Sequence, residues 1–386
     1  MDTMRIGFLF NHDQIHQIAH SLPIALAMAQ SGHEVLVAAS NDAIAAEIMR
    51  MAGPERLATI RIVRLDVRSV GSRLAERVLG GLVPARKLVI YRDNLDFFRS
   101  LDVLVVTERT SLLLKHRYGL RNLKMVLADH GAGDRAIGFG ASAAAFDHIL
   151  ASGPKIRDRL ISDAGVDPAR ISITGYAKFD TSGEPRPHLP MQANGRPTVL
   201  YNPHLSPHLS SWYTMGRAVL DHFAASARYN LIFTPHIMLF HRRFVVTIDR
   251  LRIDRPGTLD PRWLAAPNIH IDTDSRALID MTYTSAADVY LGDVSSQVYE
   301  FLRERRPCMF LNAHGIDYTD DPNYAHWQAG RVLDTLNDLD TQIDHALKSH
   351  QTDYLAMQDR LFESTFDLTQ EPSGVRAARV ITALYG

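Results

Sequence analysis

Residues 5–39 read RIGFLFNHDQIHQIAHSLPIALAMAQSGHEVLVAA. The stretch begins and ends with short apolar runs, Arg5–Phe10 and Glu34–Ala39, which are typical of buried strands. Between them, Ser21–Ser31 carries apolar residues at helical spacing, and Gly32 follows as a C-cap. A strand, a helix and a second strand in this order predict a β-α-β unit that opens a parallel, doubly wound sheet.

The same alternation continues along the chain, breaks at a stretch rich in Pro and Gly, and then restarts. We therefore expect two Rossmann-like domains, at 1–182 and 198–365, joined by a linker at 183–197. A C-terminal helix at 366–386 could pack back on the N-terminal domain. Two such domains place a ligand cleft between them, at the carboxyl ends of the strands. The later strands are expected at Asp102–Thr107, Lys124–Ala128, Asp147–Ser152, Arg170–Thr174, Thr198–Tyr201, Leu231–Thr234, Ile269–Ile271, Val289–Leu291 and Pro307–Leu311.

Composition narrows the class of protein. The 386 residues include 42 Lys and Arg against 43 Asp and Glu, so the net charge is -1 and a nucleic-acid partner is disfavoured. The single cysteine, Cys308, allows no disulfide framework and fits a reducing cytosol. The N-terminal stretch has no signal-peptide pattern, and no apolar run is long enough for a transmembrane helix. We expect a cytoplasmic protein whose membrane contact, if any, is peripheral.

The strongest local motif is ADVYLGDVSSQVYEF at Ala287–Phe301. Its strand ends before Gly292-Asp293, and Ser295 and Ser296 then stand at the start of a helix expected over 295–305. Free N–H groups and hydroxyls at a helix start favour a phosphate, and Glu300 could accept hydrogen bonds from a ribose. A plain N-cap would use the same residue types.

Three histidine-bearing loops also follow predicted strands. DHGAGDR places His130 and Arg135 after Lys124–Ala128, and TPH places His236 after the strand at 231–234. A histidine at such an edge can take a proton from a hydroxyl or stabilise a phosphate, although a structural histidine fits the same pattern. The third loop, LYNPHLSPHLSSW, offers Asn202 and His204 as weaker candidates.

Two histidine series and one basic stretch admit other interpretations. His12, His16 and His20 are four residues apart, as are His204 and His208, but neither series has the HExxH glutamate, so no metal is predicted. The chain also lacks a P-loop and a GxGxxG after its first strand. The stretch Arg73–Arg92 combines basic and apolar residues at helical spacing. It could contact anionic lipid, but an ordinary domain helix with a solvated basic face explains it better.

The motifs in order resemble the CDP-glycerol glycerophosphotransferases of teichoic-acid and capsule synthesis. DHG, GYAKFD (Gly175–Asp180), VLYNPH, LIFTPH, ADVYLGDVSSQVYEF and RRPCMFL stand where that family has WHG, GYPRND, ILYAPT, a strand ending in His, DVLITDYSSxxFDF and KPIIFY. The resemblance covers about residues 125–330. It implies the GT-B fold, in which two Rossmann-like domains face a cleft.

The resemblance also implies roles for particular residues. His130 corresponds to the proposed base at the acceptor hydroxyl, and His236 to a histidine near the donor pyrophosphate. Asp293, Ser295 and Ser296 match the donor loop, and Glu300 replaces an aspartate. This sequence departs from the family at Asp129, Lys178 and Asn202–His204, which bears on the transferred group more than on the fold.

The expected activity is metal-independent transfer of glycerol phosphate, or a related group, from a CDP-linked donor to a lipid-linked or saccharide acceptor. No cofactor other than this nucleotide substrate is expected, and the reaction could take place at the inner face of the cytoplasmic membrane. Three alternatives stay open: a GT-B glycosyltransferase, an isomerase like UDP-N-acetylglucosamine 2-epimerase, and a nucleotide-binding module without catalysis.

Overall fold

The computed structural model describes residues 3–11, 15–67, 83–128, 131–181, 187–241, 243–247 and 252–386. The chain forms two compact units. The first comprises Met1–Ala132, Phe139–Gly183 and Glu363–Gly386, and the second comprises Gly133–Gly138 and Glu184–Phe362. The short segment Gly133–Gly138 thus belongs to the second unit although the chain on both sides of it belongs to the first.

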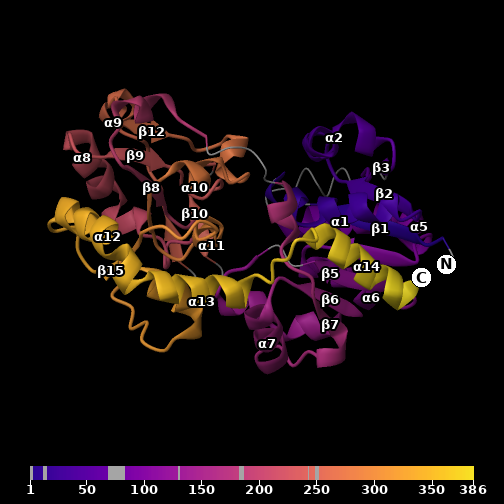
Figure 1. Cartoon of the computed structure of the whole chain (residues 1–386). Coiled ribbons are helices and arrows are strands. Elements are labelled where there is room, and N and C mark those ends of the chain that lie inside the picture. The colour runs from indigo at the N-terminus through magenta and orange to yellow at the C-terminus, as the bar shows by residue number, and fades with distance from the viewer. Residues whose placement is uncertain are drawn as a thin grey trace. The chain divides into compact units, whose positions relative to one another are not determined.

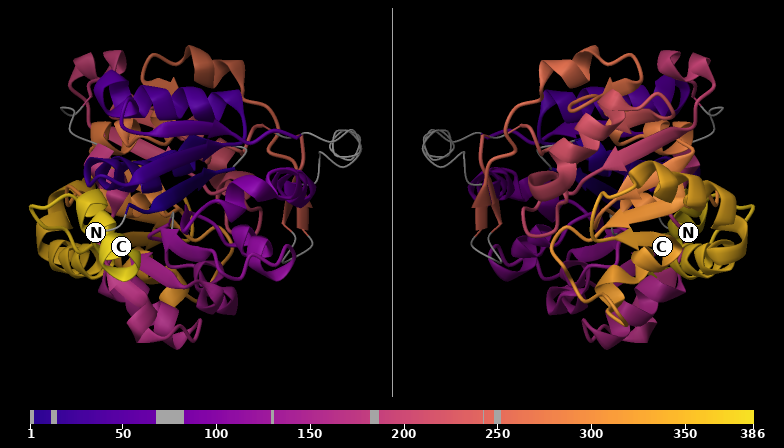
Figure 2. Two further views of the ribbon diagram at one scale, coloured as in Figure 1. Left: turned by 90° about the vertical axis from the view of Figure 1, so that its right-hand side faces the viewer. Right: turned by 90° about the vertical axis from the view of Figure 1, so that its left-hand side faces the viewer.

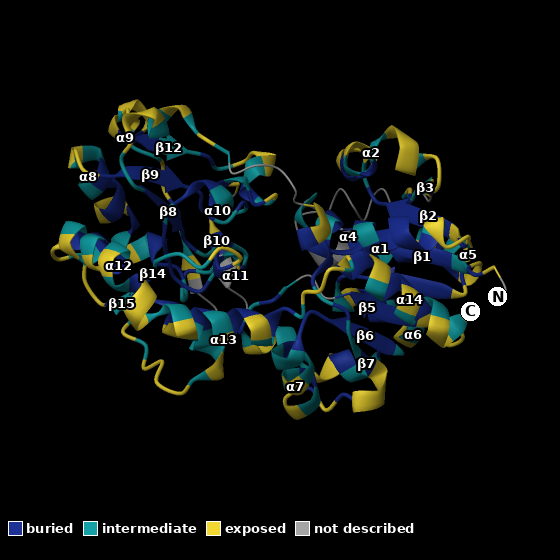
Figure 3. Cartoon of the chain, in the orientation of Figure 1, coloured by how far each residue is buried: buried dark blue, intermediate teal, exposed yellow. Residues whose placement is uncertain are grey.

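The first unit is built on a seven-stranded parallel sheet of order β3-β2-β1-β4-β5-β6-β7 (Figure 1). Its register places Phe8 opposite Val37 on one side and Val105 on the other. Nearly all of the central strands are buried, as Figure 3 shows, which is why they read as continuous apolar runs. The strands are β1 (Arg5–Phe10), β2 (Glu34–Ala39), β3 (Arg61–Arg64), β4 (Val103–Val106), β5 (Lys124–Ala128), β6 (His148–Ala151) and β7 (Ile171–Ile173).

Helices cover both faces of this sheet. Phe8 and the alternate strand residues pack with α1, α2 and α14, whereas Leu9 faces a second core with α4 to α7. The C-terminal helix α14 lies along α1 (Figures 1 and 2). The helices are α1 (Ile18–Gln30), α2 (Asp42–Leu57), α4 (Val83–Asp93), α5 (Leu95–Arg99), α6 (Leu113–His116), α7 (Pro154–Ser162) and α14 (Ser373–Tyr385).

The second unit repeats this architecture with a six-stranded parallel sheet of order β12-β9-β8-β13-β14-β15 and a separate antiparallel pair, β10 and β11. Its strands are β8 (Thr198–Asn202), β9 (Asn230–Phe233), β10 (Val245–Thr247), β11 (Arg252–Asp254), β12 (Ile269–Ile271), β13 (Val289–Gly292), β14 (Cys308–Leu311) and β15 (Arg331–Leu333). Its helices are α8 (Arg217–Ala225), α9 (Pro261–Ala265), α10 (Thr282–Ala286), α11 (Gln297–Phe301), α12 (Leu339–Asp353) and α13 (Leu355–Thr365), which runs into the first unit.

Short helical turns connect these elements. The 3-10 turns are Ile15–Gln17, Arg109–Leu112, Ala136–Phe139, Ala141–Ala145, Pro168–Arg170, Ala177–Thr181, Pro190–Asn194, Arg276–Leu278 and Pro322–Ala329, and a π turn spans Trp212–Gly216. The turn Pro190–Asn194 lies in the stretch that composition predicts as a linker. Gln192 there donates to the hydroxyl of Thr198 at 3.1 Å and to the carbonyl of Ala286 at 2.9 Å, so this part of the stretch packs on the second unit.

The two doubly wound parallel sheets confirm the predicted fold class, but the helix expected over 295–305 is wrong in length. The helix α11 spans only Gln297–Phe301. The guanidinium of Arg306 donates to the carbonyl of Phe301 at 3.3 Å, and Arg305 donates to that of Leu302 at 3.3 Å. These side chains replace the N–H groups that a longer helix would supply.

Close packing between β14 and β15 depends on a glycine. A Cβ atom on Gly330 would lie 2.0 Å from the carbonyl oxygen of Cys308, a contact that real Cβ atoms do not make. Because the obstacle is backbone, no side-chain rotation can relieve it. Any side chain at position 330 must therefore push β15 away from β14.

Candidate functional site

The loops that carry most of the candidate residues lie together at one edge of the second sheet. β9 and β13 are the two neighbours of β8, and all three strands run parallel. Their carboxyl ends lead into Asn202–His204, Thr234–His236 and Asp293–Ser296. From β8 the chain first continues to β9 and β12 on one side of it, and later to β13, β14 and β15 on the other side. This reversal of strand order makes the carboxyl ends of β8 and β13 the switch point of the sheet, where α/β folds bind ligands.

Asp293 organises these loops from inside. One carboxylate oxygen accepts hydrogen bonds from the backbone N–H groups of His204 (2.9 Å) and Val294 (2.6 Å), and the other accepts from the N–H (2.7 Å) and hydroxyl (2.9 Å) of Ser211. Burial raises the pKa of Asp293 to about 6, against the opposing effect of these four hydrogen bonds. The carboxylate is thus ionised at neutral pH, and the chain itself occupies it rather than leaving it for the donor.

Asn202 has a comparable internal role. Its amide nitrogen donates to the carbonyl of Thr234 at 2.5 Å, and its amide oxygen accepts from the hydroxyl of Tyr290 at 3.4 Å. Only 1% of Asn202 is exposed. The side chain therefore joins the ends of β8 and β9 and sets the separation of the two histidine-bearing loops.

His204 and Arg135 meet as two hydrogen-bond donors. The ring atom Nδ1 of His204 accepts the backbone N–H of Ser206 at 2.9 Å, which leaves Nε2 to carry the ring proton. The Nη1 atom of Arg135 lies 3.2 Å from this Nε2. Burial, and then the charges of Arg135 and the neighbouring histidines, lowers the pKa of His204 well below its usual value, so the ring is neutral. Two donors this close to one another favour an acceptor that receives a hydrogen bond from both.

His236 adds a third donor nearby. Its ring lies 5.9 Å from that of His204, and its Nδ1 atom accepts the N–H of Met238 at 3.2 Å, so its proton is also on Nε2. Burial lowers the pKa of His236 to about 4. The residue is therefore neutral at neutral pH in the free protein, and it offers an N–H group rather than a positive charge there.

The other residues of the expected donor loop are placed differently. Ser296 is exposed and Ser295 is half-buried, with its hydroxyl 3.4 Å from the N–H of Gln297. The helix that follows has five residues, too short for its dipole to carry the phosphate argument. Glu300 is half-buried on that helix. The backbone of Gly133 passes close to Ser296, because a Cβ atom on that glycine would lie 3.2 Å from Cβ of Ser296.

Sequence reasoning missed two residues that connect these loops, Asp134 and His326. Asp134 is 2% exposed, and its carboxylate accepts hydrogen bonds from the Tyr299 hydroxyl and from both the backbone N–H and the ring Nδ1 of His326. The other ring nitrogen of His326 lies 3.1 Å from the carbonyl oxygen of Asp293. Asp134 stands directly before Arg135 in DHGAGDR, but nothing in the sequence pairs it with a residue 192 positions later.

Some predictions fall elsewhere. His130, His12 and residues 68–82 lie outside the described residues. Of the basic stretch, Lys87 on α4 is buried and donates to Glu108 at 2.5 Å, and Tyr91 donates to the same carboxylate at 3.1 Å. This face of α4 therefore packs into the first unit. Within the described part of the chain, no helix is long and apolar enough to cross a membrane.

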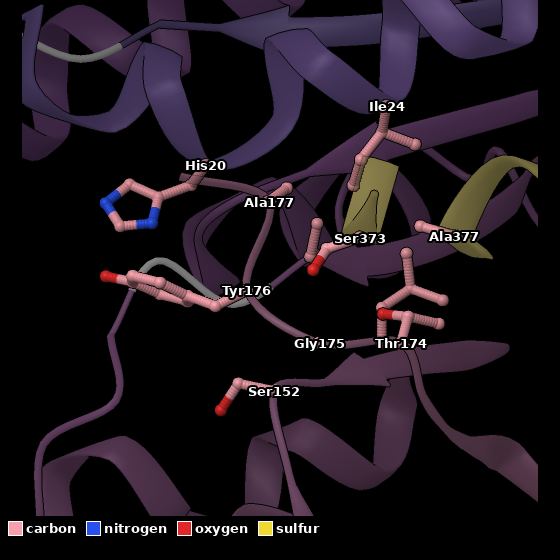
Figure 4. A pocket seen from close by; sticks show the side chains of 11 residues that line it. His20, Ile24, Ser152, Thr174, Gly175, Tyr176, Ala177, Ser373 and Ala377 are labelled. Atoms are coloured by element: carbon pink, nitrogen blue, oxygen red, sulfur yellow. The ribbon is translucent and has the colours of Figure 1, made fainter. Parts of the chain in front are cut away.

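Two further features bear on the type of site. No three His, Cys, Asp or Glu side chains among the described residues are placed to hold a metal ion. In the first unit, a cavity of about 20 Å³ lies between α1, α14 and the carboxyl ends of β5 to β7 (Figure 4). His20 and Tyr176 line one side of it, and Ser152, Thr174 and Ser373 contribute hydroxyl groups. A volume of this order suits about one water molecule, so this cavity is no site for a nucleotide-linked donor.

No protein-family model and no curated protein matches the sequence. Solved structures do share its fold. A protein from Listeria monocytogenes described as a UDP-N-acetylglucosamine 2-epimerase superimposes with a TM-score of 0.58 at 13% identity, over 99% of this chain and 96% of its own. The glycotransferase of kitacinnamycin gives 0.56 at 13% identity over 100% of both chains. A variant of the wall teichoic acid polymerase TagF, soaked with CDPG, gives a TM-score of 0.58 at 13% identity, over 99% of this chain and 88% of its own. The chain thus has the GT-B-like architecture of two α/β units.

Proposed function

We propose that this chain is a transferase that binds a nucleotide-diphosphate donor at the switch point of its second unit. The observation that carries the proposal is the set of three N–H donors from Arg135, His204 and His236. They come from three separate segments that lie close together where this class of sheet binds ligands. Diphosphate oxygens are acceptors only, and a guanidinium beside two imidazole N–H groups matches them without a metal ion.

The electrostatics of the site favour a departing phosphate. The two histidine rings are neutral because burial disfavours their charged forms, so their N–H groups are fixed dipoles in a poorly solvated setting. Such preorganised donors stabilise charge that develops during reaction, each by about 10²–10³-fold. An anion bound beside His236 would also supply the counter-charge that makes its protonation easier.

For the transferred group we propose glycerol phosphate from CDP-glycerol, on the strength of the motif resemblance and of the shared fold with TagF. The acceptor hydroxyl would lose its proton to His130 and attack phosphorus, and the bond to the leaving CMP would break as its phosphate takes up the charge. Ser295, Ser296 and Glu300 are the proposed contacts to the rest of the nucleotide. A lipid-linked or saccharide acceptor at the inner face of the cytoplasmic membrane completes this proposal.

Two other reactions fit the same site. In a glycosyltransferase, the hydroxyl would attack an anomeric carbon and a nucleoside diphosphate would leave. In an epimerase of the UDP-N-acetylglucosamine type, no acceptor would be needed, and this alternative is favoured by the fold shared with the Listeria protein. All three reactions place a diphosphate against Arg135 and the two histidines.

Calorimetric titration tests the common part of the proposal. Pyrophosphate, CDP and UDP are titrated into the full chain and into Arg135→Gln and His236→Gln, with Arg262→Gln and His222→Gln as surface controls from the same unit. We expect the two site variants to bind about 10- to 100-fold more weakly and the controls to match the wild type. Equal affinity in all five proteins would contradict the assignment of the site.

Product analysis then separates the reactions. CDP-glycerol or UDP-N-acetylglucosamine is incubated with the protein, with and without a saccharide or lipid-linked acceptor. Release of CMP only with CDP-glycerol and acceptor supports glycerophosphate transfer, release of UDP supports glycosyl transfer, and epimerised sugar without acceptor supports the isomerase. Binding without any of these products would leave a nucleotide-binding module.

A further inference from the structure

His326 lies between two hydrogen-bond acceptors in the interior of the second unit. Its Nδ1 atom is 2.9 Å from a carboxylate oxygen of Asp134, and its Nε2 atom is 3.1 Å from the carbonyl oxygen of Asp293. The side chains of His326 and Asp134 are only 4% and 0% exposed. With Asp134 ionised, neither neighbouring atom has a proton to offer: the carboxylate accepts from the Tyr299 hydroxyl and from the backbone N–H of His326, and a carbonyl never donates.

This arrangement defines the protonation of the ring. A neutral imidazole has one N–H and one lone pair, so one of its nitrogens would direct a lone pair at an acceptor. Only the doubly protonated ring donates on both sides. Asp134 supplies the compensating negative charge at hydrogen-bond distance, and a buried pair of this kind is tolerated only when its remaining groups are satisfied, as they are here by Tyr299 and the backbone N–H of His326.

The contacts of His326 connect the two sides of the donor site. Asp134 is the chain neighbour of Arg135, so the ion pair fixes the segment that presents the guanidinium. The residue on its other side, Asp293, accepts the backbone N–H of His204 at 2.9 Å. Arg135 and His204 are thus both tied to Asp293, one through the imidazole of His326 and the other directly.

We propose that His326 is a positioning residue: a buried imidazolium that, with Asp134 and the Asp293 carbonyl, holds Arg135 beside His204. The proposal deepens the proposed function and rests on it only for the identity of the bound anion. Loss of one ring proton breaks one of the two ties and releases Arg135 from the site. The residue itself touches no substrate.

The first test reads the protonation directly in the ligand-free full chain. Histidine-labelled protein is studied at neutral pH by nitrogen–proton correlation spectra of the imidazole rings. We expect His326 to show two N–H nitrogens, and His204 and His236 to show one each, at Nε2. A single N–H on His326 in the wild type would overturn the proposal, and this measurement needs no variant to fold.

The second test reads the position of Arg135 through its neighbour. The groups that face His204 are Arg135, His208, His236 and the Asp293 carboxylate, and the charge of Arg135 helps to lower the pKa of His204. Arg135→Gln should therefore raise that pKa, and His326→Gln should reproduce the rise. Tyr299→Phe is the matched control, because it removes another donor to Asp134 and leaves the imidazole in place. A His204 pKa that responds to Arg135→Gln but not to His326→Gln would refute the positioning role.

The third test uses pyrophosphate as the probe. We expect His326→Gln to weaken its binding about tenfold, and the double variant with Arg135→Gln to bind no more weakly than Arg135→Gln alone. Additive losses would mean that His326 acts by another route. If the wild type does not bind pyrophosphate, the proposed function fails, while the spectra and the His204 titration still decide the role of His326.

Discussion

The substitution Asp293→Asn tests whether one carboxylate organises the loops of the donor site. The side chain keeps its shape, but one oxygen becomes an NH₂ group. Pointed toward His204 and Val294, that group meets two backbone N–H donors. Pointed toward Ser211, it meets one N–H and a hydroxyl that can turn to accept. The second orientation costs less, and it still leaves the buried N–H of Ser211 without its acceptor.

The expected loss in the free energy of unfolding follows from these contacts. A buried N–H left without a partner costs about 1–3 kcal/mol, and each bond that changes from a charged to a neutral acceptor weakens by about 1 kcal/mol. With two such weakened bonds from His204 and Val294, the sum is about 3–5 kcal/mol. The carboxylate of Asp293 is ionised at neutral pH, because its raised pKa is still only about 6, so the substitution removes a negative charge.

Tryptophan fluorescence during urea unfolding measures this loss in the right unit. All three tryptophans of the chain, Trp212, Trp263 and Trp327, are buried in the second unit. The matched control is Asp260→Asn, which keeps an N-cap acceptor for Arg262 N–H and should change stability by less than about 0.5 kcal/mol. If Asp293→Asn stays within about 1 kcal/mol of the wild type, Asp293 is not the organiser of these loops.

Two further predictions use the same fluorescence assay. Gly330→Ala should lower the free energy of unfolding by about 2 kcal/mol or more because its methyl group meets the Cys308 carbonyl, whereas Gly138→Ala, with open space around it, should have little effect; equal effects would argue against a backbone clash. Folding lowers the pKa of His236 from 6.5 to about 4. Between these two pH values the histidine is protonated in the unfolded chain but neutral in the folded chain. Its contribution to stability therefore falls by about 1.4 kcal/mol per pH unit as the pH drops through this window, and His236→Gln should remove that slope relative to the wild type. Asp293, whose pKa is raised, acts in the opposite direction in both proteins. Parallel pH profiles of the wild type and His236→Gln would contradict the lowered pKa of His236.

The central strands could be predicted because their chemistry is uniform. β1, β4 and β13 are covered on both faces, so their sequences are short continuous apolar runs. Four strands escaped prediction: β10 and β11, and the edge strands β3 and β15 of the two parallel sheets. RIVR at β3 and RVL at β15 carry arginines, are only partly buried and are three or four residues long. Their pairing to β2 and β14 is a tertiary contact that no local pattern encodes.

The site divides in the same way. His204, His236 and Arg135 could be predicted as candidates because each follows a strand, and position after a strand is visible in the sequence. The protonation of the two histidines could not be predicted, since it depends on burial and on the backbone N–H groups of Ser206 and Met238 that face their rings. The role of Asp134 and His326 was hidden for a further reason. Their pairing requires Gly133–Gly138 to belong to the second unit, which the order of elements along the chain does not suggest.

The neutral state of His236 limits which step it can serve. With a pKa of about 4, the residue is almost entirely unprotonated at neutral pH before the substrate binds, so it cannot act as an acid at that stage. A bound diphosphate is already anionic and raises the proton affinity of His236, and the leaving phosphate raises it further as it gains charge, so the assistance of His236 is greatest in the transition state. Binding of the intact donor therefore depends mainly on the permanent charge of Arg135, which is why the segment that positions this guanidinium has its own buried ion pair.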